Sequence, residues 1–450
     1  MKKLSLLLSV ISLLIAGYIY IGSRDADFYD DHGLLNRIQA IPDHDNGYEQ
    51  ISFMNQEGYS LLTSKQRELI QDHLEDNQWD STFVDSVLKE HKPTFVLIDQ
   101  VLARPKFDML LSLAGVSINV YQQLVDLNRL LMLKIHNQYR QDELSNAIVT
   151  LDKLMRLIRA VKLKANPELI TYMIGIRQQY EALSVALMMA NNADQYIVQK
   201  ILTIVHQIPD YKTENYAAVY ATEFFISQSY YTDSSVNPLL KRLEKYHLHW
   251  LSEDALFKEK SSFEYVRAFL NALFPKFYQH KNRELDAAAD VYKSLVLRSE
   301  QPCQLQDFGQ GMLDQYLDTT SFLKIHSEAE IRERVREMIL YSQSYHHNLR
   351  CFSHSHLEAT KANLALKLYQ IEYGDLPQRL SELVPDYLSV LPVDAFDGQP
   401  LRYNVKQAYL HSVGANFKDN GGSVDSAYTD QCDKEDQYRN NPTFLLSIGK

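Results

Sequence analysis

The sequence is poor in cysteine and in basic residues, and the shortage of basic residues limits its partners. Its 450 residues contain 46 Lys plus Arg against 57 Asp plus Glu, which gives a formal net charge of −11. A nucleic-acid-binding protein needs a basic face that displaces counterions from phosphates, so this balance predicts no nucleic-acid partner. Hydrophobic residues at 45% and charged residues at 23% are typical of folded protein, and the length predicts about two to three domains.

The three cysteines, Cys303, Cys351 and Cys432, fit an oxidising compartment only loosely. An odd number leaves one thiol over, and spacing alone leaves three pairings open. We take Cys303 with Cys351 as the working prediction.

The motifs of several enzyme classes are also missing. The sequence contains no glycine-rich phosphate loop, no G-x-S-x-G elbow and no H-E-x-x-H pair. Adjacent acids such as Asp142 with Glu143 are most simply interpreted as charge on a helix surface. The sequence therefore identifies no reaction.

The N-terminus carries the longest uncharged apolar run. Lys2 and Lys3 precede Leu4–Gly22, and about nineteen helical residues at 1.5 Å each just cross a hydrocarbon layer of roughly 30 Å. A cleaved signal peptide is the alternative, but its apolar region is usually shorter, and Tyr18 and Tyr20 are typical of a membrane interface. We predict a single-pass anchor in the cytoplasmic membrane through residues 4–22, with the bulk of the chain extracytoplasmic because the lysines stay inside.

Glycine is scarce in the middle of the chain and common near its end. No glycine occurs between Gly175 and Gly309, whereas the last eighty residues combine six glycines with five prolines. This shift predicts a helical body followed by a turn-rich module. The predicted parts are an anchor or signal segment over 1–23, a body over 24–354 and a module over 355–450.

The body has helical apolar spacing, as in Ile148, Leu151, Met155 and Ile158. Similar segments predict helices over residues 124–139, 168–190, 195–208 and 214–230. These segments predict a mainly α fold class with a small C-terminal α+β module. No repeat of fixed period is found, so the multi-helix body is predicted to be irregular.

Two capping-box patterns precede the module, at Ser327 with Glu330 and at Ser355 with Glu358. They predict two helices, and the second carries an apolar side and ends at Gly374. That side consists of Leu357, Leu364, Leu368 and Ile371. Strand-like segments follow in "PLRYNV", "AYLHSV" and "TFLLSI", which predict a small sheet.

Three stretches of the tail, "LYQIEYGDLP", "LPVDAFDGQPLRY" and "YLHSVGANFKDNGG", occur in this order. Together they resemble the globular part of the type II secretion major pseudopilin, an arrangement that recurs in membrane-anchored bacterial proteins with helical bodies. The resemblance covers about 75 residues and implies a helix packed on a small antiparallel sheet with a glycine-rich calcium loop. The chain lacks the leader and processing site of pseudopilins, so we do not expect it to polymerise as a pilin does.

The resemblance implies a structural calcium ion in the tail loop. Asp419 and Asp425 match the acidic positions of the pseudopilin loop, and Asn416 stands where an aspartate is usual. Loss of one carboxylate should weaken calcium binding. The alternative is a plain turn, because Asn and Asp tolerate left-handed backbone geometry.

A second candidate metal site lies in "SYHHNLRCFSHSHLE". On a helix, His347, Cys351 and His354 share one face, and these residue types bind transition metals. The alternative is a surface cluster of histidines near a helix junction, without metal. The sequence thus favours a non-catalytic scaffold or binding protein of the bacterial envelope, associated with a secretion or pilus-like assembly and with envelope protein partners. The alternative function is a metal-dependent hydrolase built on this cluster.

Overall fold

The chain divides into two compact units. The computed structural model describes residues 28–56, 58–75, 79–109, 119–209, 214–232, 281–299, 328–422 and 442–446. One unit comprises residues 1–37, 221–295 and 308–342, and the other comprises residues 38–220, 296–307 and 343–450. The second unit contains the sheet and the largest hydrophobic core.

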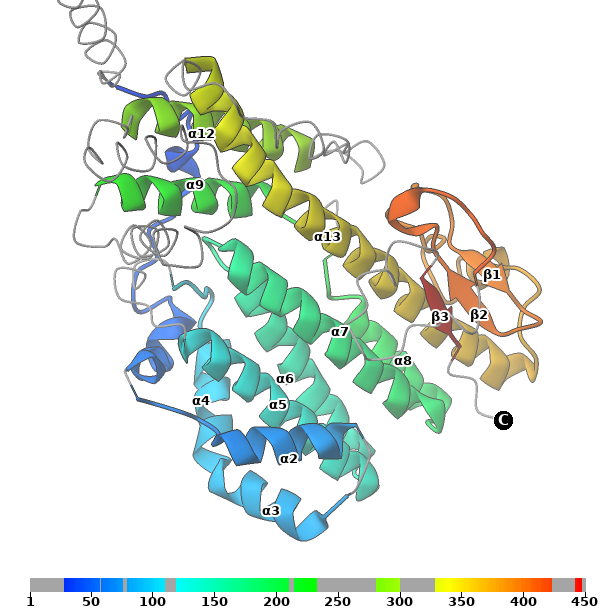
Figure 1. The fold of residues 1–450 in the computed structure, drawn as a ribbon. Coiled ribbons are helices and arrows are strands. Elements are labelled where there is room, and N and C mark those ends of the chain that lie inside the picture. The colour runs from blue at the N-terminus through cyan, green and yellow to red at the C-terminus, as the bar shows by residue number, and fades with distance from the viewer. Residues whose placement is uncertain are drawn as a thin grey trace, which may run out of the picture. The chain divides into compact units, whose positions relative to one another are not determined.

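The described chain is mainly helical, as the apolar spacing predicts, with one small antiparallel sheet near the C-terminus (Figure 1). The helices are α2 (Ser64–Leu74), α3 (Ser81–Glu90), α4 (Lys92–Leu102), α5 (Asn119–Arg140), α6 (Leu144–Lys162), α7 (Leu169–Asn191), α8 (Gln195–Val205), α9 (Ala217–Thr232), α12 (Lys281–Ser299) and α13 (Glu328–Tyr373). The strands are β1 (Arg402–Asn404), β2 (Tyr409–His411) and β3 (Thr443–Leu445). The helices predicted from spacing are confirmed, with shifts at their ends.

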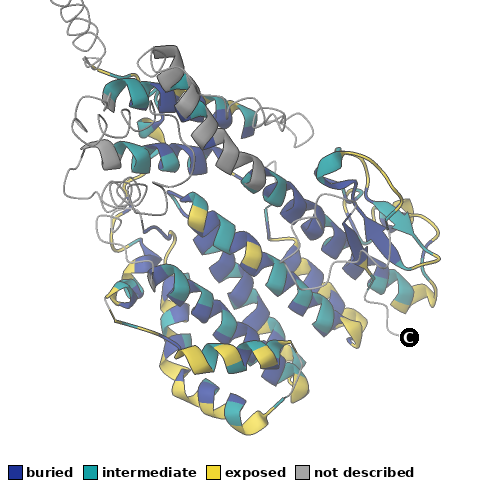
Figure 2. Ribbon diagram, viewed as in Figure 1, coloured by how far each residue is buried: buried dark blue, intermediate teal, exposed yellow. Residues whose placement is uncertain are grey.

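Helices α5, α6 and α7 pack against one another at the centre of the second unit. On α6, the predicted stripe residues Leu151, Met155 and Ile158 are buried, which is why this segment forms an amphipathic helix. Figure 2 shows dark blue buried positions along these helices and yellow exposed positions along α2 and α3. Most of the buried apolar residues of α2 to α8 belong to one hydrophobic core.

Local capping decides where several helices begin. Helix α8 starts at Gln195 because the Asp194 carboxylate accepts a hydrogen bond from the Ile197 N–H at 2.9 Å. Thr63 and Gln66 form a reciprocal capping box at the start of α2. These caps satisfy N–H groups that have no partner within the helix.

Gly175 lets α7 approach the end of α6 closely. A Cβ atom at this position would lie 2.5 Å from the Cβ and 3.0 Å from the Cα of Lys162. Both are near-backbone atoms that cannot move away without shifting the helix. The glycine therefore sets the separation of α6 and α7 beside the buried Lys162 side chain.

We expect Gly175→Ala to destabilise the protein by about 1–3 kcal/mol, although alanine is the better helix former, because the added methyl group overpacks this contact. Urea unfolding of the full chain measures the change. Asn191→Ala, at an exposed position of the same helix, serves as the control and should change stability by less than about 0.5 kcal/mol. A wild-type midpoint for Gly175→Ala would show that the two helices are free to move apart.

The first unit has its own aromatic and ionic contacts. The rings of Phe224 and Tyr292 meet edge to face at 6.1 Å between centroids. Arg332 pairs with Asp286 at 2.5 Å and also with Asp290. These contacts connect α9, α12 and α13 within that unit.

Helix α13 is continuous, so the prediction of a separate helix beginning at Ser355 is wrong. Ser355 is fully buried, and its hydroxyl donates to Asp394 Oδ1 at 2.9 Å instead of capping a helix end. The local pattern resembled a cap because a serine followed by a glutamate has the same spacing in both settings. Here a tertiary partner binds the hydroxyl.

The C-terminal half of α13 is buried on two sides as far as Leu368, whereas Ile371, which the sequence places on the apolar side, is exposed. Leu357, Leu364 and Leu368, which the sequence places on one side, belong to the core of the helical body. Phe352 and Leu366 belong to a second core that packs against the sheet. A helix that is buried on both sides cannot show one clean apolar stripe, and it joins the body and the sheet into one folded unit.

The sheet has the strand order β1-β2-β3 and is antiparallel throughout. All three strands lie within the predicted segments, which confirms the sheet. Leu410 on the central strand pairs with Tyr403 on one side and with Phe444 on the other. Leu410 and Phe444 are buried in the same core as Phe352 and Leu366 of α13.

None of the described helices is both long enough and apolar enough to cross a membrane. The predicted anchor, residues 4–22, lies outside the described residues.

Candidate functional site

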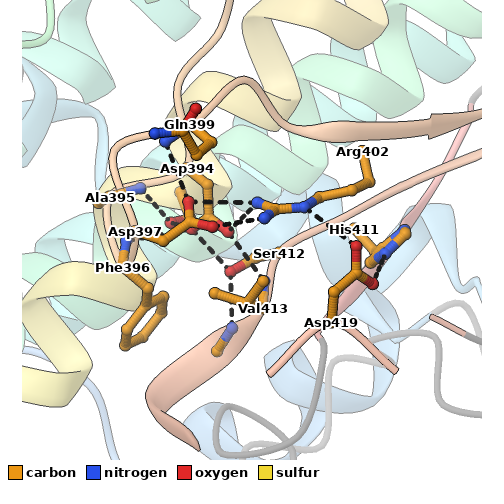
Figure 3. A network of polar contacts seen from close by, with 12 residues as sticks. Asp394, Ala395, Phe396, Asp397, Gln399, Arg402, His411, Ser412, Val413 and Asp419 are labelled. Carbon is orange, nitrogen blue, oxygen red and sulfur yellow. Dashed lines mark hydrogen bonds and ion pairs between the residues drawn. The ribbon is translucent and has the colours of Figure 1, made fainter. Parts of the chain in front are cut away.

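Asp394 is the centre of a polar network in the C-terminal module (Figure 3). Its side chain is fully buried. Oδ1 accepts hydrogen bonds from the Ser355 hydroxyl at 2.9 Å and the Ser412 hydroxyl at 2.8 Å, and Oδ2 accepts from the Val413 N–H at 2.8 Å. The Phe396 N–H also donates to Oδ1, at 3.1 Å. One carboxylate thus connects α13, the loop after it and the end of β2.

Arg402, at the start of β1, joins three aspartates. Its guanidinium donates to Asp394 Oδ2 at 3.1 Å, to Asp397 Oδ1 at 3.2 Å and to Asp419 Oδ2 at 3.3 Å. A planar guanidinium has five N–H groups in a fixed geometry, so it can bind several carboxylates together. The loop that contains Asp419 is therefore attached to the sheet through a protein cation (Figure 3).

The glycine-rich loop is also held by His411. Its Nε2 lies 2.9 Å from Asp419 Oδ1, which in addition accepts the Gly421 N–H at 2.9 Å. Gly422 has φ +60°, and a Cβ there would lie 2.8 Å from the His411 ring. Only glycine fits this position, because both the left-handed backbone and the close ring exclude a side chain.

The predicted calcium residues are only partly described. Asn416 and Asp419 lie on the same loop, and Asp425 lies outside the described residues. Asn416 Oδ1 accepts the Lys418 N–H at 2.9 Å, as in a turn. In this arrangement Arg402 and His411 bind the Asp419 carboxylate, and a calcium ion would have to displace them.

Two of the three aspartates of the network, Asp394 and Asp419, have opposite pKa shifts. Burial raises the pKa of Asp394, and hydrogen bonds from Val413, Ser412 and Phe396 act against this effect. The hydrogen bond from His411 is the main reason that the pKa of Asp419 is lowered. Asp419 therefore holds its negative charge more firmly and suits a salt bridge to Arg402.

A second polar cluster, fully buried, lies in the helical body around Glu214. Glu214 Oε1 lies 2.7 Å from Lys162 Nζ, and Oε2 accepts the Tyr172 hydroxyl at 2.6 Å. Arg350 Nε and His354 Nε2 lie 3.3 Å and 3.0 Å from the same Oε2. The cluster thereby joins α6, α7, α13 and the segment before α9.

The charges of this cluster are also held by rings. The Arg350 guanidinium lies 4.4 Å from the centroid of the Tyr216 ring, and Lys162 Nζ lies 5.2 Å from that of Tyr172. Burial raises the pKa of Glu214, but Lys162, His354 and Arg350 outweigh burial and hold it well below its ordinary value. Glu214 is therefore the ionised partner of two buried cations.

The side chains of this cluster are too deeply buried for a substrate to reach them. Lys162, Glu214, Arg350 and His354 have side-chain exposures of 3%, 0%, 1% and 2%. A general acid or base must lie within hydrogen-bond reach of the group that reacts. The cluster is consequently a structural feature of the core.

The structure brings together two of the three residues of the predicted transition-metal site, and the third has another partner. His347 Nε2 lies 3.4 Å from Cys351 Sγ, whereas His354 faces Glu214. Cys351 is disulfide-bonded. Cys303 and Cys432 lie outside the described residues, so the pairing of Cys303 with Cys351 stays a prediction. A disulfide sulfur is not a thiolate, which is the form that binds metal. Within the described ranges, no group of three or more His, Cys, Asp or Glu is arranged to hold a metal ion.

Two buried histidines should make stability depend on pH. Burial lowers the pKa of His354 to about 4, against Glu214, which raises it, and burial lowers the pKa of His356 to about 3. Between these values and about 6.5, the unfolded chain binds protons that the folded chain does not. The contribution of these two histidines to the free energy of unfolding is therefore full above about pH 6.5 and is lost as the pH falls toward their folded-state pKa values.

We expect the free energy of unfolding to fall between pH 7 and pH 5 by on the order of 2 kcal/mol for each of these histidines. Urea unfolding at both pH values measures the difference. His356→Phe should remove on the order of 2 kcal/mol of this fall, because His356 stacks among aromatic rings and phenylalanine does not titrate. His44→Gln, at an exposed position, should leave the pH dependence unchanged. An unchanged pH dependence in His356→Phe would contradict this assignment.

Several of these residues carried no recognisable signal in the sequence. Asp394 and Arg402 lie in the stretch "DAFDGQPLR" that carries the resemblance, but their spacing alone suggests no shared network. Glu214 stands 136 residues before Arg350, its partner on α13. Only the packing of helices brings such groups together.

Comparison with protein-family models, with curated protein sequences and with solved structures gives no match to this chain.

Proposed function

We propose that this chain is a non-catalytic scaffold or binding protein of the bacterial envelope, anchored in the cytoplasmic membrane through residues 4–22. In this proposal the C-terminal pseudopilin-like module docks an envelope protein of a secretion or pilus-like assembly. The proposal rests on the resemblance of the tail and on the apolar groups that the module exposes. Of the twelve large apolar side chains exposed in the described residues, five belong to the module. They are Ile371, Tyr373, Val390, Phe417 and Leu445.

These exposed groups are the observation that carries the proposal. The core of the module is built by α13 and the sheet, and none of the five exposed apolar side chains belongs to it. Phe417 also meets the ring of the buried Phe396 at 6.2 Å between centroids. Val390 is 68% exposed and Phe417 is 47% exposed. The inference rests on their number, since five of the twelve exposed large apolar side chains lie in this one module.

The test is crosslinking of the full chain in membranes, followed by capture and comparison of variants. We expect an envelope protein to be captured with wild type and lost with the double variant Val390→Ser and Phe417→Ser, and an unchanged Tm of this variant checks that the module stays folded. Val96→Ser with Val149→Ser removes two exposed valines of the body and should retain the partner. Equal capture with both double variants, or capture of no envelope protein, would contradict the docking proposal.

Calcium binding by the tail loop is a separate part of the proposal. The ion would use Asp419, with Asn416 and Asp425, and would compete with Arg402. A ligand that binds only the folded state at a hundred times its Kd adds about 2.7 kcal/mol, which thermal unfolding with chelator and with excess calcium resolves. We expect a calcium-specific rise in Tm that is lost in Asp419→Asn. An unchanged Tm would instead make the loop a turn held by Arg402.

The alternative function, a metal-dependent hydrolase, requires His347, Cys351 and His354 to bind one metal ion. The contacts of these residues do not favour it. Elemental analysis of the purified full chain tests it directly, because one equivalent of a transition metal would support the enzyme and its absence would leave the scaffold as the proposal.

A further inference from the structure

A pocket of about 480 Å³ in the helical body is lined by an unusual number of cations. It lies between the end of α4 with the loop that follows it and the end of α6 with residues 163–165. Its basic lining residues are Arg104, Lys106, Arg156, Arg159 and Lys164. These are five of thirteen lining residues, in a chain with 46 Lys plus Arg among 450 residues. None of the lining residues described is acidic.

The arginines are fixed in place by backbone carbonyls. Arg156 Nη2 donates to the Leu102 carbonyl at 3.1 Å, and Arg159 Nη1 donates to the Gln207 carbonyl at 3.1 Å. Arg104 donates to the His44 carbonyl. Each guanidinium has five N–H groups, so one such bond orients it and still leaves donors for a ligand. Cations that are already positioned lose less entropy on binding.

Nearby carboxylates neutralise only part of this charge. Lys164 is buried and pairs with Glu168, and Arg156 lies 3.9 Å from Asp152. Arg104 and Lys106 are exposed on the loop between α4 and the buried Phe107. Two helices also end at the pocket, and their terminal carbonyls would repel an anion, but Arg156 binds one of these carbonyls. The positive charge that these carboxylates leave unneutralised favours a negatively charged ligand.

The apolar part of the lining restricts the ligand further. Leu102, Pro105, Phe107 and Leu163 contribute apolar walls, and the volume is in the range of pockets that hold small organic ligands. Guanidinium groups bind phosphate and carboxylate with two parallel hydrogen bonds. We propose that this pocket binds an organic phosphate, in which the phosphate contacts the arginines and an apolar body contacts these walls. This ligand site is independent of the docking module.

The test is isothermal titration calorimetry of the full chain in a nonionic detergent, with phenyl phosphate as the soluble probe. A second probe is dihexanoyl phosphatidylglycerol, which presents the same phosphate chemistry as a lipid headgroup. Benzyl alcohol is the uncharged control. We expect saturable binding of one phenyl phosphate or one lipid per chain, no binding of benzyl alcohol, and weaker binding at higher salt concentration. Tighter binding of the lipid would identify a headgroup as the source of the phosphate.

The double variant Arg104→Gln and Lys106→Gln should weaken phosphate binding at least about tenfold, because each lost cation removes a charge-assisted hydrogen bond. Both side chains are exposed, so the fold should be retained, and an unchanged Tm checks this. Lys65→Gln with Lys89→Gln makes the same charge change on exposed positions of α2 and α3 and should bind like wild type. The proposal is overturned if neither phosphate probe binds, or if both double variants bind as wild type does.

Discussion

We expect Glu214→Gln to lower the free energy of unfolding by about 3–5 kcal/mol, because it leaves Lys162 and Arg350 buried without their counter-charge. Glutamine has nearly the same shape, so the change tests charge and not packing. Its amide can still accept the Tyr172 hydroxyl, but it carries no negative charge. Urea unfolding of the full chain at pH 7 measures the loss.

The matched control is Glu181→Gln, which removes a partly exposed carboxylate from α7. Glu181 pairs with Arg177 one turn earlier at 3.1 Å, and surface pairs of this kind contribute less than about 1 kcal/mol. Glu214→Gln and the control should therefore differ severalfold in effect. Similar small losses in both variants would mean that water reaches the buried cations.

The loss in the free energy of unfolding should also depend on which member of the Glu214 cluster is replaced. Lys162→Met removes one of the two cations and leaves Glu214 with Arg350, so the remaining pair is balanced. We expect this variant to lose less stability than Glu214→Gln, because a balanced buried pair costs less than two unpaired cations. The order of the two losses is the result to compare.

Asp394→Ala should have the second large effect, about 3–5 kcal/mol, and it should be confined to the C-terminal module. The substitution leaves the buried Ser355 and Ser412 hydroxyls and the Val413 N–H without their acceptor, and it removes one partner of Arg402. Amide hydrogen exchange locates the change. We expect β1 and β2 to lose protection while α5 and α6 keep it.

Asp386→Asn is the control for this substitution, because Asp386 is an exposed carboxylate of the same module. It should change stability by less than about 0.5 kcal/mol. Asp394→Asn tests the charge separately, since asparagine keeps an oxygen acceptor but presents an NH₂ group to N–H donors. Full protection of the strands in Asp394→Ala would show that the sheet is held by its apolar core alone.

Much of the secondary structure could be predicted because it depends on neighbours in the chain. The buried stripe of α6 follows from apolar residues three and four positions apart, and Asp194 marks the start of α8. The three strand segments were recognisable from alternation and flanking turns. The misplaced helix start at Ser355 shows the limit of such signals, because the same residue pattern also serves a tertiary contact.

The sequence by itself determined a mainly helical chain with a small antiparallel sheet at its end, since helical spacing and turn residues act over a few positions. Only the tertiary structure decided that Glu214 meets Arg350 and His354, which are 136 and 140 residues away. It also decided that α13 is shared by two cores and that five cations line one pocket. Such contacts depend on how whole helices pack, and no local pattern encodes the partner of a distant charge.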